Sequence, residues 1–270
     1  MTHQEIVCKS RCRNHCTEAF AVYFVRFVMA ARVRTVKRHR PHATDQGTQE
    51  IPPPLVGRCR FPMVDTSADN PRPPILGAIL IYDGCPDCAR KWILLSEDSD
   101  NGFAISARLT AGLGPDKTLA VQSSLMSVPQ PKGIHFVDVE TPSNVSFIGS
   151  SCGLATFIAA YFGVTNFVAT GFLLEGGTSV PRSLQVMDIE NLTTKLTIRG
   201  APIICPMKSL RECLSAGVIS VDQIYGVEKL VAGLPVPPIL RAVPVETVGD
   251  LIALLTTLLK VYSDDKLSNI

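Results

Sequence analysis

Two adjacent serines, Ser150 and Ser151, lie where the sequence predicts a strand-to-helix corner. An apolar run ends at Gly149, and Cys152-Gly153 leads into small and apolar residues with helical spacing. The first N–H groups of a helix have no partner inside the helix, so they can stabilise an oxyanion that develops on a substrate. Gly149, Cys152 and Gly153 are therefore the candidate oxyanion backbone, and a serine at this corner is a candidate nucleophile.

A lysine further along the chain, Lys195, could act as the base that such a serine needs. A lysine takes a proton from a hydroxyl only if its pKa falls well below the ordinary value of about 10.4. Burial among apolar groups can lower the lysine pKa by up to about 3–5 pH units. Leu192, Leu196 and Ile198 surround Lys195 in the sequence, and Glu190 is the nearest acid before it. We therefore expect a buried amine that is neutral at the working pH.

These residues resemble the Ser/Lys proteases of the Lon fold, and more closely the birnavirus polyprotein proteases that share this fold. The stretch Gly149-Ser150-Ser151-Cys152-Gly153-Leu154 matches the Gly-x-Ser-x-Gly-Leu/Ile context of the Lon nucleophile. The viral enzymes have a later Thr-Gly pair whose hydroxyl holds the lysine amine, and a lysine in a Ser/Thr-Thr-Lys-Leu context. Here Ala169-Thr170-Gly171 and Thr193-Thr194-Lys195-Leu196 match these two features. The resemblance implies that Ser151 is the nucleophile, Lys195 the base and Thr170 the residue that orients the amine.

The viral type fits better than Lon itself. Asp188 to Glu190 stand where Lon would place its lysine, counting back from the strand at Ile203–Pro206. The resemblance covers roughly Leu76 to Leu259 and is densest over residues 146–206. It implies a serine endopeptidase that cuts a polypeptide, which could be its own precursor, in the cytoplasm of a host cell. The chain has no G-x-x-x-x-G-K-[ST] motif, so we expect an ATP-independent enzyme without a cofactor.

Each of these signals also has an ordinary structural explanation. Serines at helix starts are most often caps, lysines are usually solvated, and a lone Gly-x-Ser-x-Gly is weak. A catalytically inactive Lon-fold module that binds peptides or serves a structural role is therefore the second hypothesis. A thiol nucleophile at Cys152 stays open, and His135, the one histidine after residue 42, is more simply a packed or edge residue of a strand.

The elements that must position these residues predict an α+β (mixed α/β) fold. A strand-rich half is followed by a helix-rich half, in agreement with the Lon-like fold that the resemblance implies. Strands are predicted at 75–82, 91–95, 103–109, 118–125 and 134–140. Beyond the site, helices are predicted at 209–216 (capped by Ser209 and stopped by Gly217), 220–231 and 248–262, with a short strand at 240–243.

Four segments are predicted along the chain: a basic and apolar N-terminal segment (1–50), disordered or helical, a Pro-rich linker (51–74), the protease domain (75–262) and a tail (263–270). The apolar run 19–31 contains Arg26 and is too short for a confident membrane span, which needs about 20 apolar residues. It could lie on a membrane, which would make the chain a membrane-associated accessory protein. It could instead pack as an amphipathic helix or be removed on processing.

Nucleic acid is not an expected partner, because the basic residues near the N-terminus are not interleaved with aromatic ones. The nine cysteines include one C-x-x-C pair, Cys85 and Cys88. A structural zinc site needs four ligands, and no second pair occurs at the usual spacing. Cys85 and Cys88 are therefore weak metal candidates, and an odd cysteine count with no convincing signal peptide favours reduced thiols in a reducing compartment.

Overall fold

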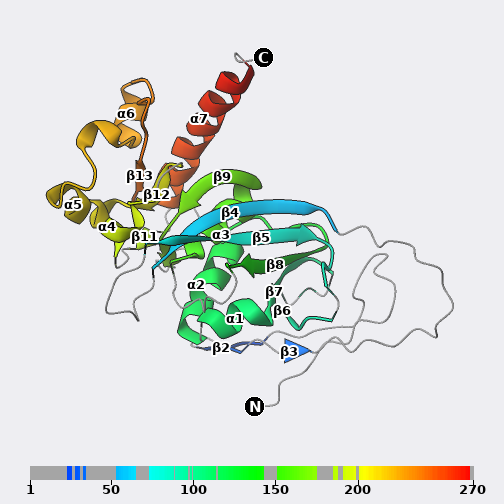
Figure 1. Ribbon diagram of the computed structural model, residues 1–270. Helices are drawn as coiled ribbons and strands as arrows, with labels where there is room; N and C mark the ends of the chain where they lie inside the picture. Colours follow the sequence, from blue (N-terminus) through cyan, green and yellow to red (C-terminus); the bar gives the residue numbers. More distant parts are fainter. Residues whose placement is uncertain are drawn as a thin grey trace.

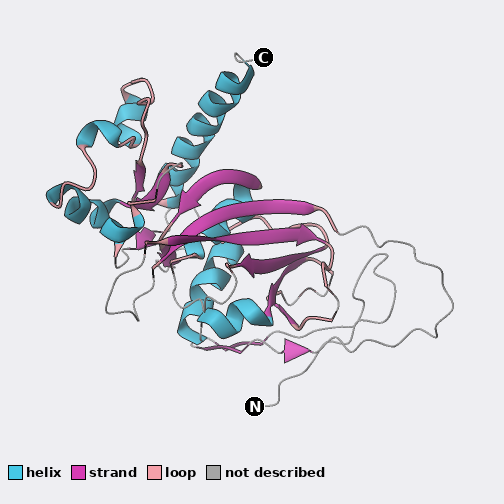
Figure 2. Cartoon of the chain, viewed as in Figure 1, coloured by secondary structure: helices cyan, strands magenta, loops and turns pink. Residues whose placement is uncertain are grey.

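A computed structural model describes most of the chain from residue 53 onward (Figure 1). The described residues are 23–25, 28–30, 33–34, 53–64, 73–87, 89–96, 98, 100–113, 115–142, 151–174, 185–187, 191–198 and 201–267. One long twisted sheet forms the centre, with α2 (Pro115–Met126) and α3 (Gly153–Phe162) against one face (Figures 1 and 2). Three short helices gather at one end of this sheet, next to β12 (Ile203–Pro206) and β13 (Ala242–Val245) (Figure 1). They are α4 (Leu192–Lys195), α5 (Met207–Ser215) and α6 (Val227–Val231).

The central sheet has nine strands in the described residues, in the order β13-β12-β9-β4-β5-β8-β7-β6-β3. The pairs β4/β9, β9/β12, β12/β13 and β7/β8 are parallel, and the other neighbours are antiparallel. The architecture is therefore mixed α/β. The strands are β3 Val33–Arg34, β4 Leu55–Met63, β5 Ile75–Asp83, β6 Trp92–Leu94, β7 Gly102–Ser106, β8 Ile134–Glu140, β9 Val164–Ala169, β12 Ile203–Pro206 and β13 Ala242–Val245.

Two small strand pairs and further helices complete the described structure. β1 pairs with β2, and β10 pairs with β11, both antiparallel. Their bounds are β1 Tyr23–Val25, β2 Val28–Ala30, β10 Phe172–Leu174 and β11 Gln185–Met187. The remaining helices are α1 Ala107–Leu113, α4 Leu192–Lys195, α5 Met207–Ser215, α6 Val227–Val231 and α7 Val248–Leu267, with a 3-10 turn η2 Val221–Gln223.

The two faces of the sheet carry separate apolar clusters. Phe61, Ile79 and Phe157 belong to the larger cluster, in which α3 packs on β4, β5 and β9. Gly57 lets α3 approach this closely, because a Cβ there would lie 2.4 Å from the carbonyl oxygen of Ala159. Replacing a large side chain of this cluster such as Phe157 by alanine is expected to cost about 3–5 kcal/mol of unfolding free energy.

The second cluster lies under α4 and α5. Val168 of β9 and Ile203 of β12 belong to it, together with Leu192 and Leu196 from the turn that carries Lys195. Successive residues of a strand point to opposite faces. Ala169 and Ile204 accordingly belong to the larger cluster on the α3 side, while Val168, Ile203 and Cys205 face α4 and α5. By the same alternation Thr170, the residue after Ala169, points to the side of α4 and α5.

The strand predictions are confirmed for 75–82, 91–95 and 134–140 and are wrong for 118–125. Residues 118–125 lie inside α2, where Ala120, Val121, Ser124 and Leu125 are buried with helical spacing. The strand predicted for 103–109 ends at Ser106, because the Ser106 hydroxyl accepts the Leu109 N–H at 3.2 Å and starts α1. A short apolar run does not distinguish a buried strand from a buried helix by periodicity alone.

The linker predicted for 51–74 is wrong over Leu55–Met63. These residues form β4, which is hydrogen-bonded to β5 on one side and β9 on the other. Cys59, Phe61 and Met63 alternate into the larger cluster. The prolines on both sides of this strand hid its pattern in the sequence, and the folded domain begins before the predicted boundary near residue 75.

The N-terminal segment lies mostly outside the described residues. Within the run 19–31 the structure has the strand pair Tyr23–Val25 and Val28–Ala30, so the alternative of an amphipathic helix is wrong for these residues. Val33–Arg34 pairs with β6 at the edge of the central sheet. In the described part of the chain, no helix has both the length and the apolar character to cross a membrane.

The C-terminal elements were predicted in kind and differ in their bounds. α5 begins at Met207 with Pro206 in the cap position, so Ser209 is a buried residue inside the helix and not its cap. Gly217 stops this helix as predicted, with φ 67°. The predicted helix 220–231 is split into η2 and α6, and the strand predicted at 240–243 is β13.

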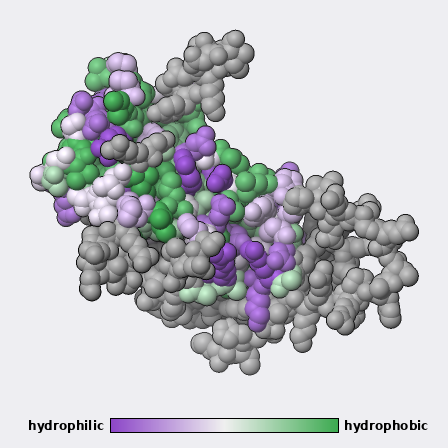
Figure 3. Space-filling view, in the orientation of Figure 1, coloured by the Kyte–Doolittle hydropathy of each residue, from purple (hydrophilic) through white to green (hydrophobic). Residues whose placement is uncertain are grey.

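The last helix continues beyond its predicted end at residue 262. It reaches Leu267 and includes most of the predicted tail, 263–270. Hydrophobic and hydrophilic residues are mixed on the surface around α6 (Figure 3), where Val231 is 81% exposed.

Candidate active site

Ser151 lies half-buried at the start of α3, which confirms the helical side of the predicted corner, and the strand side lies outside the described residues. Cys152 stands in the N-cap position with φ −85° and ψ −7°, and Gly153 is the first helical residue. A Cβ on Gly153 would lie 3.2 Å from both the Ala120 carbonyl oxygen and the Cβ of Phe172. Glycine therefore lets the start of α3 pack tightly between α2 and β10. Gly149 and Ser150 lie outside the described residues.

Two reciprocal backbone hydrogen bonds join this corner to the residues that follow β9. The Gly171 N–H donates to the Ser151 carbonyl at 3.0 Å, and the Leu154 N–H donates to the Gly171 carbonyl at 2.9 Å. Gly171 has φ 134°, a conformation that favours glycine. The structure thus brings Ser151 and Thr170, which are far apart in sequence, to one place.

Thr170 is fully buried at the end of β9. Its N–H donates to the Ile204 carbonyl at 2.9 Å, which extends the pairing with β12 by one residue. By strand alternation its side chain follows that of Val168, toward the cluster under α4 and α5. Its hydroxyl oxygen makes no hydrogen bond within the described part of the chain. The hydrogen bond from Lys195 to Thr170 that the resemblance implies is therefore not formed in this structure.

Lys195 is the last residue of α4 and is only 7% exposed. Leu192 and Leu196 on either side of it are each 1% exposed and anchor this turn in the cluster that also holds Val168. Burial raises the pKa of the Cys152 thiol, and the positive charge of Lys195 offsets a small part of this rise. Lys195 is therefore buried in a turn that packs beside the end of β9, the strand that leads to Thr170.

Neither alternative nucleophile or base fits this geometry. Burial raises the pKa of the Cys152 thiol to about 12, so the reactive thiolate is not available near neutral pH. His135 lies at the beginning of β8, which runs parallel to β9 through β5 and β4. It is therefore at the opposite end of the sheet from Thr170, where its ring packs edge-on against Phe103.

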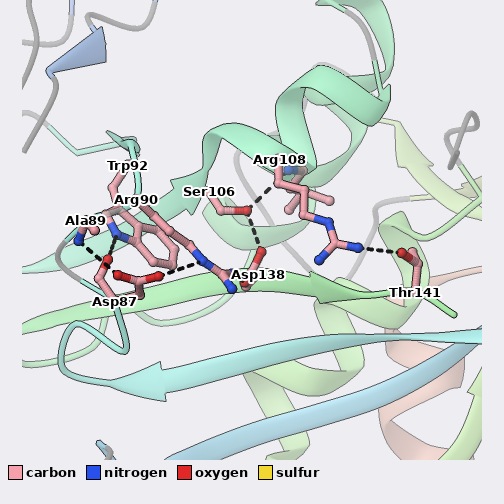
Figure 4. A network of polar contacts seen from close by, with 9 residues as sticks. Asp87, Ala89, Arg90, Trp92, Ser106, Arg108, Asp138 and Thr141 are labelled. Atoms are coloured by element: carbon pink, nitrogen blue, oxygen red, sulfur yellow. Dashed lines mark hydrogen bonds and ion pairs between the residues drawn. The ribbon is translucent and has the colours of Figure 1, made fainter. Parts of the chain in front are cut away.

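The segment of the C-x-x-C motif is tied to strand β8 by side-chain contacts of Asp87 and Arg90. Asp87 holds this turn, because its carboxylate accepts the Ala89 N–H at 2.9 Å and the Arg90 side chain at 3.2 Å (Figure 4). Arg90 also pairs with the buried Asp138, which accepts the Ser106 hydroxyl at 2.6 Å.

Cys85 is half-buried beside Trp92 and Phe136 in a small apolar cluster, and Cys88 lies outside the described residues. Among the residues that the structure describes, no group of three His, Cys, Asp or Glu side chains could hold a metal.

Two features of this part of the structure have no prediction in the sequence. One is the buried Asp138 with its Ser106 partner, which was not predicted although an acid inside the apolar strand Ile134–Glu140 is a signal for it. Arg241 donates to the Val218 carbonyl at 3.0 Å and to the carbonyl of Leu196, the residue after Lys195. Nothing in the sequence around Arg241 indicates that it reaches this turn.

The arrangement combines a half-buried hydroxyl at a helix start with a buried amine and a buried hydroxyl nearby. Acyl transfer needs groups of this kind: a nucleophile, a base in apolar surroundings and N–H donors for an oxyanion. A scan against protein-family models and a search of curated proteins both gave no match to this chain.

Proposed function

We propose that this protein is an ATP-independent serine endopeptidase with a Ser151/Lys195 dyad. The observation that carries the proposal is the burial of Lys195, 7% exposed, in a turn that packs with Val168 of β9, the strand whose end is hydrogen-bonded to Ser151 through Gly171. A lysine is rarely buried without a reason, because taking its charge out of water costs free energy. The proposal includes a Lon-like fold of the birnavirus protease type.

In the proposed reaction, neutral Lys195 takes the hydroxyl proton of Ser151 while the oxygen attacks the carbonyl carbon of the scissile peptide bond. The carbonyl oxygen becomes anionic and accepts hydrogen bonds from N–H groups at the start of α3. Lys195 then gives its proton to the leaving amine as the C–N bond breaks, which leaves an ester on Ser151. The neutral amine of Lys195 then takes a proton from a water molecule, whose oxygen attacks the ester carbonyl. As the C–O bond to Ser151 breaks, Lys195 returns the proton to the serine oxygen and the carboxylic acid product leaves.

Three backbone positions and one hydroxyl complete the proposed machinery. The Leu154 N–H is bonded to the Gly171 carbonyl, so the oxyanion donors are the N–H groups before it, from Cys152, Gly153 and the preceding Gly149. Thr170 orients the amine by accepting a hydrogen bond from it. In this structure the Thr170 hydroxyl makes no hydrogen bond with any described residue, so the proposed bond from Lys195 would form only when substrate binds, as catalytic hydrogen bonds often do.

The proposed substrate is a polypeptide, and the first candidate to test is a longer polypeptide in which this chain's own sequence is embedded. A helix start, a serine and a buried lysine fix the reaction type but carry no information on the residues around the cleaved bond. The second hypothesis, a Lon-fold module without catalysis, is the outcome that the following experiment separates from the first.

Labelling of the full chain by a fluorophosphonate serine probe tests the proposal. The probe should label Ser151, Ser151→Ala should abolish labelling, and Lys195→Met should slow it by about 10²- to 10⁴-fold, the usual contribution of a general base. Cys152→Ala should keep most of the labelling rate. Labelling should become faster toward alkaline pH, because only the neutral amine accepts the serine proton.

Lys208→Met is the matched control, because Lys208 is an exposed lysine on α5. It should label at the wild-type rate. Lys195→Met should be at least as stable as the wild type, since a thioether costs less to bury than an amine. Full labelling of Lys195→Met, or loss only in Cys152→Ala, would show that the machinery is wrongly assigned, and no labelling of any variant would favour the module without catalysis.

A further inference from the structure

The position of Arg241 is fixed by its backbone before its side chain is considered. Its N–H donates to the Gln223 carbonyl at 3.0 Å, and its carbonyl accepts the Ile203 N–H at 2.8 Å. Arg241 therefore sits between η2 and β12, one residue before β13 begins. This places a half-buried guanidinium at the edge of the cluster that anchors α4.

The guanidinium binds two carbonyls from different segments. One of its terminal nitrogens donates to Val218, in the loop after α5, and the other donates to Leu196. Leu196 is the C-cap residue of α4 and directly follows Lys195. Carbonyls at a helix end have no partner inside the helix, and a cationic donor there is favourable.

The turn that carries Lys195 needs such contacts from outside. α4 has four residues, and an isolated helix of this length is not stable in water. Asn191 before it has φ 59°, a left-handed conformation that is uncommon outside glycine. The direction of the Lys195 side chain therefore depends on how its turn is held by the surrounding structure, through Leu192, Leu196 and the bond from Arg241.

We propose that Arg241 is a positioning residue for Lys195, an inference that rests on the proposed function. Its planar fork reaches both carbonyls at once and fixes the end of α4 relative to the loop after α5. A lysine in its place has a single ammonium on a flexible stem and keeps at most part of this arrangement. Arg241 does not touch the reacting atoms, so its effect is on how often the amine points at Ser151.

The test compares Arg241→Met and Arg241→Lys with the wild type, using the fluorophosphonate probe on the full chain. The maximal inactivation rate and the probe concentration at half-maximal rate are measured separately. Arg241→Met should lower the maximal rate by about 10- to 100-fold, as small misplacements of catalytic groups do, with the half-maximal concentration unchanged. Arg241→Lys should recover much of this loss and stay about fivefold below the wild type, the effect of one lost hydrogen bond.

Arg211→Met is the control, because Arg211 is exposed on α5 and its loss should leave both quantities unchanged. Ser151→Ala run beside it separates the two proposals: persistent labelling of Ser151→Ala refutes the proposed function. Where Ser151→Ala is unlabelled, an Arg241→Met rate equal to that of Arg211→Met overturns the positioning role. If Arg241→Met does not fold, a folded Arg241→Lys variant that reacts at the wild-type rate overturns it equally.

Discussion

Replacing Thr170 by valine should make the protein more stable and less active. Thr170 is 0% exposed, and its hydroxyl oxygen makes no hydrogen bond within the described residues. Valine has nearly the same shape and the same branching at Cβ, so it fits the end of β9 without new strain. The substitution removes the hydroxyl and leaves the packing.

The size of the stability gain follows from the lost hydrogen bonds of the hydroxyl to water. A buried polar group without a partner costs about 1–3 kcal/mol. Part of this cost is relieved by relaxation, so we expect Thr170→Val to raise the free energy of unfolding by about 1–2 kcal/mol. For a domain of this size each kcal/mol corresponds to about 2–4 °C in Tm, measured by thermal unfolding.

Thr165→Val is the matched control on the same strand. Thr165 is 6% exposed, and its hydroxyl donates to the Arg58 carbonyl at 3.2 Å. The same substitution there removes a formed hydrogen bond and should lower the free energy of unfolding by about 0.5–1.5 kcal/mol. Thr165 lies at the far end of β9 from the candidate site, so probe labelling of Ser151 should be unchanged in Thr165→Val and about 10- to 100-fold slower in Thr170→Val.

Two outcomes would refute this reasoning separately. A loss of stability in Thr170→Val equal to that in Thr165→Val would mean that the Thr170 hydroxyl has a partner in the native state. A gain of stability with an unchanged labelling rate would mean that the hydroxyl is an unpaired structural group and does not orient Lys195.

Two further predictions concern the fold. Removing residues 1–70 deletes β4, which pairs with β5 and β9, so the truncated chain should show no cooperative thermal transition, whereas a normal transition would place β4 outside the folding unit. Burial lowers the pKa of His135, and the carboxylate of Asp83 offsets this in part. The native state therefore binds fewer protons than the unfolded state, and the stability that neutral His135 provides is present above about pH 6.5 and falls as the pH drops below it. The decrease in Tm from neutral to mildly acidic pH should be smaller in His135→Gln than in the wild type; an equal decrease would assign the pH dependence to other groups.

The neighbourhood of Ser151 and Thr170 was predictable because its signals are local. Small residues after Ser151 start α3, and the Thr170-Gly171 pair ends β9 in a conformation that glycine favours. The contact between the two segments is carried by backbone groups, which every sequence supplies. What the pattern could not provide is the state of the side chains: the Thr170 hydroxyl does not bond Lys195 in this structure.

The errors come from elements whose identity depends on distant partners. β4 is a strand because β5 and β9 supply hydrogen bonds on its two sides, and nothing between the flanking prolines shows those partners in advance. Residues 118–125 are apolar enough for either a strand or a helix, and packing of α2 against α3 and β10 decides for a helix. Arg241 acts on the Leu196 carbonyl only through the fold, so its role is invisible in the sequence.

Three features that cost free energy lie at one junction, and others of this kind lie elsewhere in the described residues, such as the unbonded Nε of Arg58 and the buried carboxylate of Asp138. A buried lysine, a buried hydroxyl without a hydrogen bond among the described residues and a non-glycine residue at φ 59° all lie where β9, α3 and α4 meet. Each of these costs free energy, and a sequence selected for stability alone would replace Lys195 and Thr170 by apolar residues. Such costs can persist where function requires them, and the backbone hydrogen bond from Gly171 to Ser151 joins this junction to the candidate nucleophile, which supports placing the proposed reaction here.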